Sequence, residues 1–277
     1  MFTDKNVAFI GGGIMGEAMI RGLITQNIVA PNQIYVADPL PERLDDLRQR
    51  YEVRVTTSNA EAAEAGQVIV MSVKPQNLAD VMPGIRGHLR RQDLLLSILA
   101  GTPIRKLADG VAHAAVVRAM PNTPAQIGMG MTVWTGTPEV TEMQRGQAQA
   151  ILGALGTELY VNDEGYLDMA TALSGTGPAY IFLFMEALID AGVHLGFSRK
   201  IAEQLVLQTM AGSVEIARQS DLHPAQLRNM VTSPGGTSAE ALYELEKGAL
   251  RTILSKAVWA AYRKSKYLGD LSEKHGS

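Results

Sequence analysis

The sequence predicts an α/β domain built on a doubly wound parallel sheet, followed by an all-α domain. Two observations lead to this prediction. In the first part of the chain, short runs of aliphatic and β-branched residues alternate with helical segments, a pattern typical of sheets covered by helices on both faces. After about Asn162 the strand pattern stops, and helices with short breaks follow. We therefore expect two domains, residues 1–162 and residues 163–277.

The predicted strands are short, and several are apolar at nearly every position. Continuous apolar runs are expected for parallel strands that are buried on both faces. The first strand, NVAFI, leads through GGG into the helix EAMIRGLITQN, and the second, QIYVADP, precedes the helix PERLDDLRQRY. The later strands are QVIVMSVKP, LLLSILAG, AAVVRAM, GMTVWTG and ELYVND.

Composition excludes several classes of function. The chain has 277 residues with a net charge of −3 and no block of lysine and arginine, so nothing favours a nucleic-acid partner. It has no cysteine, which excludes disulfides, thiolate metal sites and cysteine nucleophiles and fits a reducing cytoplasm. The five histidines are scattered without metal-ligand spacing, and we expect no metal site. The start of the chain lacks the pattern of a signal peptide, so we expect a cytoplasmic protein.

The C-terminal part is rich in alanine, leucine and methionine. Its longest apolar run, AYIFLFMEALIDAGVHLG, carries Glu186 and Asp190 in the middle. Two carboxylates in the middle of the run favour a buried or interface helix over a membrane span. Because no strands are available to cover these helices, we predict that they form a dimerisation domain.

A glycine motif follows the first strand. Gly11, Gly13 and Gly16 have the spacing GxGxxG between a strand and a helix, and Asp38 ends the next strand. In this pattern the glycines allow a tight turn, a close approach of backbone to a pyrophosphate, and close packing of helix on strand. The helix N-terminus supplies amide donors. The context predicts a Rossmann-type dinucleotide-binding domain that uses NADH or NADPH.

Asp38 bears on the choice of cofactor. A carboxylate at this position accepts a hydrogen bond from a ribose 2′-hydroxyl and repels a 2′-phosphate, which favours NADH. Two other interpretations stay open: Asp38 begins the helix PERLDDL, or Arg43 offsets the repulsion of a phosphate.

Three further stretches lie where the predicted strands end. Lys74 in SVKPQN meets a phosphate or ribose oxygen, or is an exposed loop lysine. Ala100 and Gly101 in SILAGTP are small enough for a nicotinamide ring to lie against backbone. Asn59 follows Ser58 in a predicted capping box and either reaches the adenosine or is only the first residue of a helix.

The stretch SPGGTSAE interrupts the helical C-terminal part. Thr237 and Glu240 have the spacing of a capping box, which predicts that Thr237 caps the restarting helix. In either case the backbone amides around Gly236 to Ala239 are donors at a positive helix end and suit a substrate carboxylate, with Gly235 and Gly236 as part of the binding turn. The hydroxyl of Ser238 is not used by such a cap. The stretch is thus predicted to be both a turn and an anion site.

Two families share motifs with the chain. The GIMG segment resembles the 3-hydroxyacid dehydrogenases, but Ile181 stands where those enzymes place the catalytic lysine, which argues against that activity. The segment VTSPGGTSAEALYELEKGALRTIL is similar to the signature of pyrroline-5-carboxylate reductase. FIGGGIMGEAM, SVKPQN, RAMPNTPA and LSGTGPAY resemble the other motifs of that family, in the same order, from Phe9 to about Leu268.

This resemblance implies a Rossmann domain, a helical domain that interleaves into dimers, and rings of those dimers. It implies that Glu164, Thr237 and Ser238 face the substrate, with Ser238 orienting or protonating the ring nitrogen. Glu164 either favours a cationic iminium or is an ordinary loop carboxylate. It further implies a cofactor lining of Gly11, Gly12, Gly13, Ile14, Met15, Asn59, Ser72, Val73, Lys74, Pro75 and Ala100.

The chain departs from the family pattern at two positions. Asp38 stands where members that favour NADPH carry a small hydroxyl residue, and Ser238 replaces a more usual threonine. The expected reaction is hydride transfer to the C=N carbon of pyrroline-5-carboxylate, giving proline. Two alternatives stay open: a reductase for another imine or a keto acid, and a dinucleotide sensor without catalytic activity.

Overall fold

The computed structural model describes residues 2, 3 and 5–274. The chain forms two compact units, Met1–Gly177 together with Ala261–Ser277, and Pro178–Ala260. The predicted end of the strand pattern near Asn162 follows the last strand, β8 (Gly156–Tyr160). The division into domains at that residue stays a prediction.

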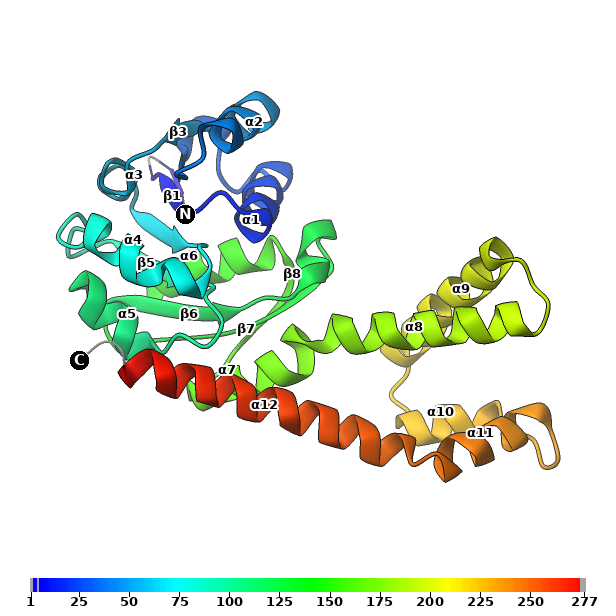
Figure 1. Ribbon diagram of the computed structural model, residues 1–277. Helices are drawn as coiled ribbons and strands as arrows, with labels where there is room; N and C mark the ends of the chain where they lie inside the picture. The colour runs from blue at the N-terminus through cyan, green and yellow to red at the C-terminus, as the bar shows by residue number, and fades with distance from the viewer. Residues whose placement is uncertain (1, 4, 275–277) are drawn as a thin grey trace. The chain divides into compact units, whose positions relative to one another are not determined.

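The first unit contains an eight-stranded sheet with the order β3-β2-β1-β4-β5-β6-β7-β8 (Figure 1). Strands β2 and β3 lie on one side of β1, and β4 lies on its other side, so the direction of strand addition reverses at β1. The carboxyl ends of β1 and β4 therefore form the switch point at which such sheets bind ligands. The remaining strands are β1 (Val7–Ile10), β2 (Ile34–Ala37), β3 (Arg54–Thr56), β4 (Val68–Met71), β5 (Leu94–Ser97), β6 (Val116–Met120) and β7 (Gly130–Gly136).

Alternate residues of the central strands enter two separate cores. In β1, Val7 and Phe9 pack in one core, and Ala8 and Ile10 pack in the other. Because both faces are covered, none of these four side chains is solvent-exposed, which explains the continuous apolar runs in the sequence. The first core is covered by α1 (Ile14–Thr25), α2 (Pro41–Tyr51) and α6 (Glu142–Gly153); the second is covered by α3 (Asn59–Ala65), α4 (Leu78–Ile85) and α5 (Ile104–Val111).

The sheet differs from the prediction in two details. Strand β7 runs antiparallel to β6, whereas a fully parallel sheet was expected. Residues 121–129 connect these strands with a single short 3₁₀ segment, Thr123–Ile127, which is too short for a crossover between parallel strands. Strand β3 was not predicted, because it has three residues, none of them buried, at the edge of the sheet.

The last elements of the first unit lie between β8 and the second unit in sequence. Helix α7 (Gly165–Ala170) continues without a break into a π-helical turn, Thr171–Gly175. Asn122 donates to the Ser174 carbonyl over 3.1 Å and accepts from the Met131 amide over 2.9 Å. The RAMPNTPA motif thus anchors the segment LSGTG that precedes α8 (Gly177–His194).

The second unit is entirely helical. It consists of α8, α9 (Arg199–Gln219), α10 (Pro224–Met230), α11 (Thr237–Lys247) and the first part of α12 (Leu250–Lys274). Among the described residues of α8 to α11, Ala202 alone is buried within the single chain. Large apolar side chains are exposed on every one of these helices, among them Phe182, Leu183, Leu205, Val214, Met230 and Tyr243. A soluble monomer does not leave so much apolar surface in water, so these helices need an apolar partner.

One helical stretch, Gly165–His194, is long and apolar enough to cross a membrane by length and composition alone. It contains Glu186 and Asp190 near its C-terminal part. Asp190 forms an ion pair of 2.8 Å with Arg199 of the next helix. Charged groups held in this way favour the predicted interface helix.

Candidate cofactor and substrate sites

A hollow of about 610 Å³ lies at the switch point of the sheet. It is formed by the turns that follow β1, β2, β3 and β4, and by the start of α4. Seven of its lining residues were predicted cofactor residues: Gly11, Gly13, Asp38, Asn59, Ser72, Val73 and Lys74. The others are Ala37, Pro39, Leu40, Thr57, Asn77, Asp80 and Val81. The residues of this second group were not predicted from the sequence to bind the cofactor. Leu40 is an exposed apolar residue two positions after Asp38, and this is the signal that could have indicated it.

The first glycine of the loop is required by backbone geometry. Gly11 has a φ of +100°, and a Cβ there would lie 2.9 Å from both the Ser72 carbonyl oxygen and Val73 Cγ1. Its amide donates to the Ala37 carbonyl over 2.8 Å, and its carbonyl accepts from the Ser72 hydroxyl over 2.7 Å. The turn after β1 is therefore fixed to β2 and β4 at once.

The next two glycines differ in their surroundings. A Cβ on Gly12 would lie 2.7 Å from Leu47 Cδ1, so the position is sterically closed. A Cβ on Gly13 would meet no atom within 4 Å. Gly13 is the N-cap of α1 and no side chain caps this helix. Open space in front of uncapped amides at a helix N-terminus suits the pyrophosphate of a dinucleotide, and the hollow fits this cofactor.

Asp38 accepts hydrogen bonds from the backbone of two segments, the turn after β1 and the segment before α2. Its Oδ2 accepts from the Gly12 amide over 2.9 Å, and its Oδ1 accepts from the Leu40 amide over 3.0 Å. Leu40 is the N-cap of α2, so Asp38 does support the start of that helix. Each carboxylate oxygen accepts more than one hydrogen bond, and the side chain also lines the hollow. The two interpretations of Asp38 are compatible.

Arg43 uses all three of its guanidinium nitrogens within the first unit. Nε donates to the Gly12 carbonyl over 2.6 Å, Nη1 pairs with Asp46 over 2.7 Å, and Nη2 pairs with Glu17. The Gly12 peptide groups are thus held by Asp38 at the amide and by Arg43 at the carbonyl. Arg43 does not line the hollow among the residues that the structure describes.

Glu17, in the first turn of α1, is the acceptor at the centre of this cluster. Tyr51 Oη donates to it over 2.7 Å, and Arg50 pairs with it over 2.7 Å. Burial acts to raise the pKa of Glu17, but hydrogen bonds from Arg43 and Tyr51 and the charges of Arg43 and Arg50 together hold the pKa below 4.5. Burial and the hydrogen bond to Glu17 raise the pKa of Tyr51.

The lowered pKa of Glu17 predicts an acid-dependent contribution to stability. Since the folded pKa lies below the unfolded value of 4.5, the contribution is fully present above that value and is lost as pH falls through the folded pKa. Urea unfolding should show Glu17→Gln less stable than wild type at pH 7, with the difference shrinking below pH 4.5. A difference that stays constant down to the lowest pH at which both proteins fold would contradict this linkage.

The other predicted cofactor residues have varied positions. Ile14 is exposed at the start of α1, Met15 packs against the core, and a Cβ on Gly16 would lie 2.7 Å from the Gly11 carbonyl oxygen. Pro75 begins a 3₁₀ segment after Lys74. Gly101 is buried with a φ of +63°, and a Cβ there would lie 3.3 Å from Leu268 Cβ of α12. Ala100 beside it is exposed.

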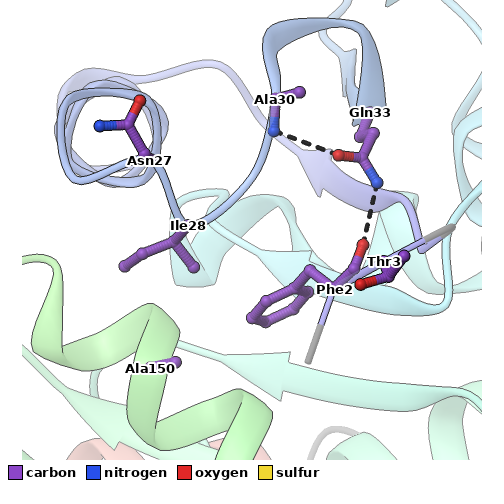
Figure 2. A pocket seen from close by; sticks show the side chains of 7 residues that line it. All are labelled: Phe2, Thr3, Asn27, Ile28, Ala30, Gln33 and Ala150. Atoms are coloured by element: carbon purple, nitrogen blue, oxygen red, sulfur yellow. Dashed lines mark hydrogen bonds between the residues drawn. The ribbon is translucent and has the colours of Figure 1, made fainter.

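Two other hollows lie at the opposite ends of the parallel strands, where these strands begin. One of about 450 Å³ lies beside the segments that precede β1 and β2, where Gln33 accepts from the Ala30 amide and donates to the Phe2 carbonyl (Figure 2). The second, of about 600 Å³, is lined by residues that precede β1, β4, β5 and β6, and by residues of α6 and the segment before it. Ligands of doubly wound sheets bind at the carboxyl ends, so neither hollow is the dinucleotide site.

The turn Ser233–Gly236 begins α11 in the second unit. Gly235 has a φ of +65°, and the Gly236 amide donates to the Ser233 carbonyl over 3.1 Å. The N-cap is Gly236 and makes no side-chain cap, so the predicted capping box of Thr237 and Glu240 is wrong. Because the turn ends in an extended glycine, Thr237 is already the first helical residue, and its hydroxyl makes no capping hydrogen bond.

The absence of a side-chain cap leaves donors at this helix start. The Thr237 and Ser238 amides, as well as the two hydroxyls, find no acceptor among the residues that the structure describes. A Cβ on Gly236 would lie 2.5 Å from Ser233 Oγ, a contact that rotation of the serine relieves, so glycine is favoured in this turn mainly by the positive φ of Gly235. Thr237 and Ser238 thus present donors at the positive end of a helix of 11 residues, whereas the Gly236 amide is already used by the Ser233 carbonyl.

Glu164 belongs to an ion-pair network in the first unit, centred on the buried Arg118. Its Oε1 accepts from Arg118 over 2.6 Å and from the Ile104 amide over 2.8 Å. Arg118 also lies 3.7 Å from Asp168, which accepts from the Ser265 hydroxyl over 2.7 Å. The network joins β6, the start of α5, α7 and α12. The predicted contact of Glu164 with substrate stays a prediction, but the carboxylate is held in place and is not an ordinary loop side chain.

Comparison with known proteins identifies two family matches along the chain. Residues 6–101 match the family described as NADP oxidoreductase, coenzyme F420-dependent. Residues 164–268 match the family described as pyrroline-5-carboxylate reductase dimerisation. The second match covers the helices with exposed apolar side chains, so this region is a dimerisation domain.

Full-length similarity extends to curated proteins and to solved structures. The pyrroline-5-carboxylate reductase of Synechocystis sp. is 43% identical over 95% of this chain and 98% of its own length. The solved structure of the reductase from Coxiella burnetii has a TM-score of 0.89 with 36% identity, covering 96% of this chain and 99% of that chain. The Plasmodium falciparum structure, with NADP bound, has a TM-score of 0.87 with 36% identity, covering 96% and 98%.

Proposed function

The chain belongs to the pyrroline-5-carboxylate reductase family, and we propose that it reduces 1-pyrroline-5-carboxylate to L-proline with NADH or NADPH, the final step of proline biosynthesis. The observation that carries this proposal is the pairing of two features in one chain: an open glycine loop beside a hollow at the sheet's switch point, and a helix start with free amides and hydroxyls. A protein that only sensed a dinucleotide would not need the second feature.

The reaction adds a hydride to the C=N carbon and a proton to the ring nitrogen. The reduced nicotinamide supplies the hydride when bound. An imine of this kind is basic enough to be protonated near neutral pH, so the chain need not supply a strong acid. Its residues bind and orient the substrate, which lowers the barrier by holding the reacting carbon in the productive geometry.

Each substrate residue has a proposed task. The Thr237 and Ser238 amides at the start of α11 bind the substrate carboxylate. The Ser238 hydroxyl orients the ring nitrogen or donates a proton to it, and Thr237 stands beside it as the second hydroxyl. Glu164, fixed by Arg118 and the Ile104 amide, contributes a negative charge that favours the cationic iminium.

We further propose that the homodimers assemble into rings of dimers and that the enzyme acts in the cytoplasm, without a nucleic-acid or membrane partner. The net charge of −3 and the absence of cysteine support this setting. We also propose that the dinucleotide-binding domain covers residues 1–162 and that the helical dimerisation and substrate domain covers residues 163–277.

A steady-state assay tests the activity directly. Purified protein is given pyrroline-5-carboxylate with NADH or NADPH, and proline is measured as the product. A six-membered cyclic imine and a keto acid are compared in the same assay. Formation of proline with the highest kcat/KM of the series supports the proposal. Faster turnover of another imine or of the keto acid would assign a different reductase activity, and no turnover of any substrate would favour the sensor.

The preference between the two cofactors depends on Asp38. We expect wild-type protein to use both, with a kcat/KM for NADH at least equal to that for NADPH. Asp38→Ser should shift the ratio toward NADPH by about 1.5–3 kcal/mol, roughly tenfold to a hundredfold, because it removes a charge repulsion and a charged hydrogen bond. Asp80→Asn is the matched control, since Asp80 lines the same hollow from α4. A wild-type preference for NADPH above about tenfold would show that Asp38 does not act on the ribose.

A further inference from the structure

Arg43 is the cation placed nearest in sequence to the predicted ribose site, one turn after Asp38. An arginine in this region is able to bind a 2′-phosphate. In this chain, however, its three guanidinium nitrogens are bonded to the Gly12 carbonyl, Asp46 and Glu17. The Arg43 side chain is about one-quarter exposed. A new bond to a phosphate would require it to leave at least one of these partners.

Glu17 is the most strongly held of those partners. It accepts from Arg43 and Tyr51 and pairs with Arg50, and its side chain is only 16% exposed. Asp46 is more exposed, at 41%, and water screens its attraction for Arg43 more effectively. Glu17 therefore supplies the stronger restraint on the direction of the Arg43 side chain.

The charges of the cluster also act against a 2′-phosphate. Glu17 and Asp46 pair with Arg43 and Arg50, and Asp38 accepts from the Gly12 amide, whose carbonyl Arg43 binds. A phosphate carries close to two negative charges at neutral pH and would meet the Asp38 carboxylate, which lines the hollow together with Asp80 and the cationic Lys74. A 2′-hydroxyl carries no charge and only needs the acceptor that Asp38 offers.

We propose that Glu17 is a specificity-determining residue for the cofactor: it holds Arg43 against the Gly12 carbonyl, away from the adenine ribose, and thereby favours NADH over NADPH. Glu17 acts through Arg43 and is a positioning residue. This inference rests on the proposed assignment of the hollow to the dinucleotide. It goes beyond Asp38, because it names the residue that prevents the nearby cation from compensating the repulsion.

The test measures binding of NADH and NADPH to the full-length protein by fluorescence or calorimetry, without imine substrate. 2′,5′-ADP is the probe for the phosphate subsite alone. Glu17→Gln should improve binding of NADPH relative to NADH by about tenfold, the size expected for one new hydrogen bond to a charged group. The gain should disappear in Glu17→Gln/Arg43→Ala. In the wild-type background, Arg43→Ala should change binding of both cofactors by the same factor.

Asp45→Asn is the matched control. Asp45 lies on α2, the helix that carries Arg43, and pairs only with Arg48 among the residues that the structure describes. The variant therefore loses one carboxylate and should leave the cofactor ratio unchanged. If Glu17→Gln does not fold, Glu17→Asp keeps the charge but shortens the reach, and should shift the ratio in the same direction.

Two outcomes would overturn the inference. Equal changes for NADH and NADPH in Glu17→Gln would mean that Glu17 only supports the loop. A selective loss of NADPH binding in Arg43→Ala alone would mean that Arg43 already reaches the phosphate. Both outcomes leave the proposed reaction intact. If wild-type protein bound neither dinucleotide, the assignment of the hollow and this inference would fail together.

Discussion

Replacing Glu164 and Asp168 together by glutamine and asparagine is expected to lower the free energy of unfolding by about 3–5 kcal/mol. The two carboxylates neutralise Arg118, whose side chain is only 5% exposed. Without them a guanidinium charge remains in a nearly dry environment, and the cost of desolvating it is no longer offset. Urea unfolding at a fixed protomer concentration measures the change, because the stability of a dimer depends on concentration.

Replacing Arg118 instead of the two carboxylates should lower the free energy of unfolding by a smaller amount. Arg118→Met leaves two carboxylates whose side chains are 34% and 19% exposed, and these groups are able to recover part of their hydration. A triple variant with all three changes should regain much of the stability, because a buried ion pair is often no better than apolar or neutral side chains of similar size. If Arg118→Met is more destabilising than the double carboxylate variant, the argument from exposure is wrong.

The central part of the sheet could be predicted from the sequence because its signals are local. Continuous apolar runs marked β1, β4 and β5, and the spacing of Gly11, Gly13 and Gly16 placed the loop after β1. The carboxyl end of each strand then located the residues that line the hollow. These inferences need only the alternation of strands and helices and the rule that ligands bind at the switch point.

The rest depends on contacts between residues far apart in the chain. Nothing near Arg43 in sequence indicates that Glu17 will hold it, and nothing near Glu164 indicates Arg118. The available signal for Arg118 was its charge inside the apolar run AAVVRAM, where an arginine requires a buried partner. The Thr237 cap was predicted from spacing alone, and the glycine turn before it moved the cap by one residue.

Ser238→Ala is expected to lower kcat for imine reduction by about tenfold to a thousandfold, the range for one oriented hydrogen bond or proton transfer in the transition state. Binding of NADH and NADPH should stay nearly unchanged, because Ser238 does not line the hollow that we assign to the dinucleotide.

The fold of α11 should also survive this change. Ser238 is the second residue of the helix, and the cap is formed by Gly236, so the variant removes no capping interaction. Ser213→Ala is the matched control, since its hydroxyl donates to the Thr209 carbonyl on α9, and it should leave kcat within about twofold of wild type. Thermal unfolding of both variants separates folding from chemistry. If Ser238→Ala turns over at the wild-type rate, the Ser238 hydroxyl has no role in the reaction, and the side chain is that of an ordinary helix residue. Only the Thr237 and Ser238 amides would then remain as the proposed substrate-binding groups of the turn.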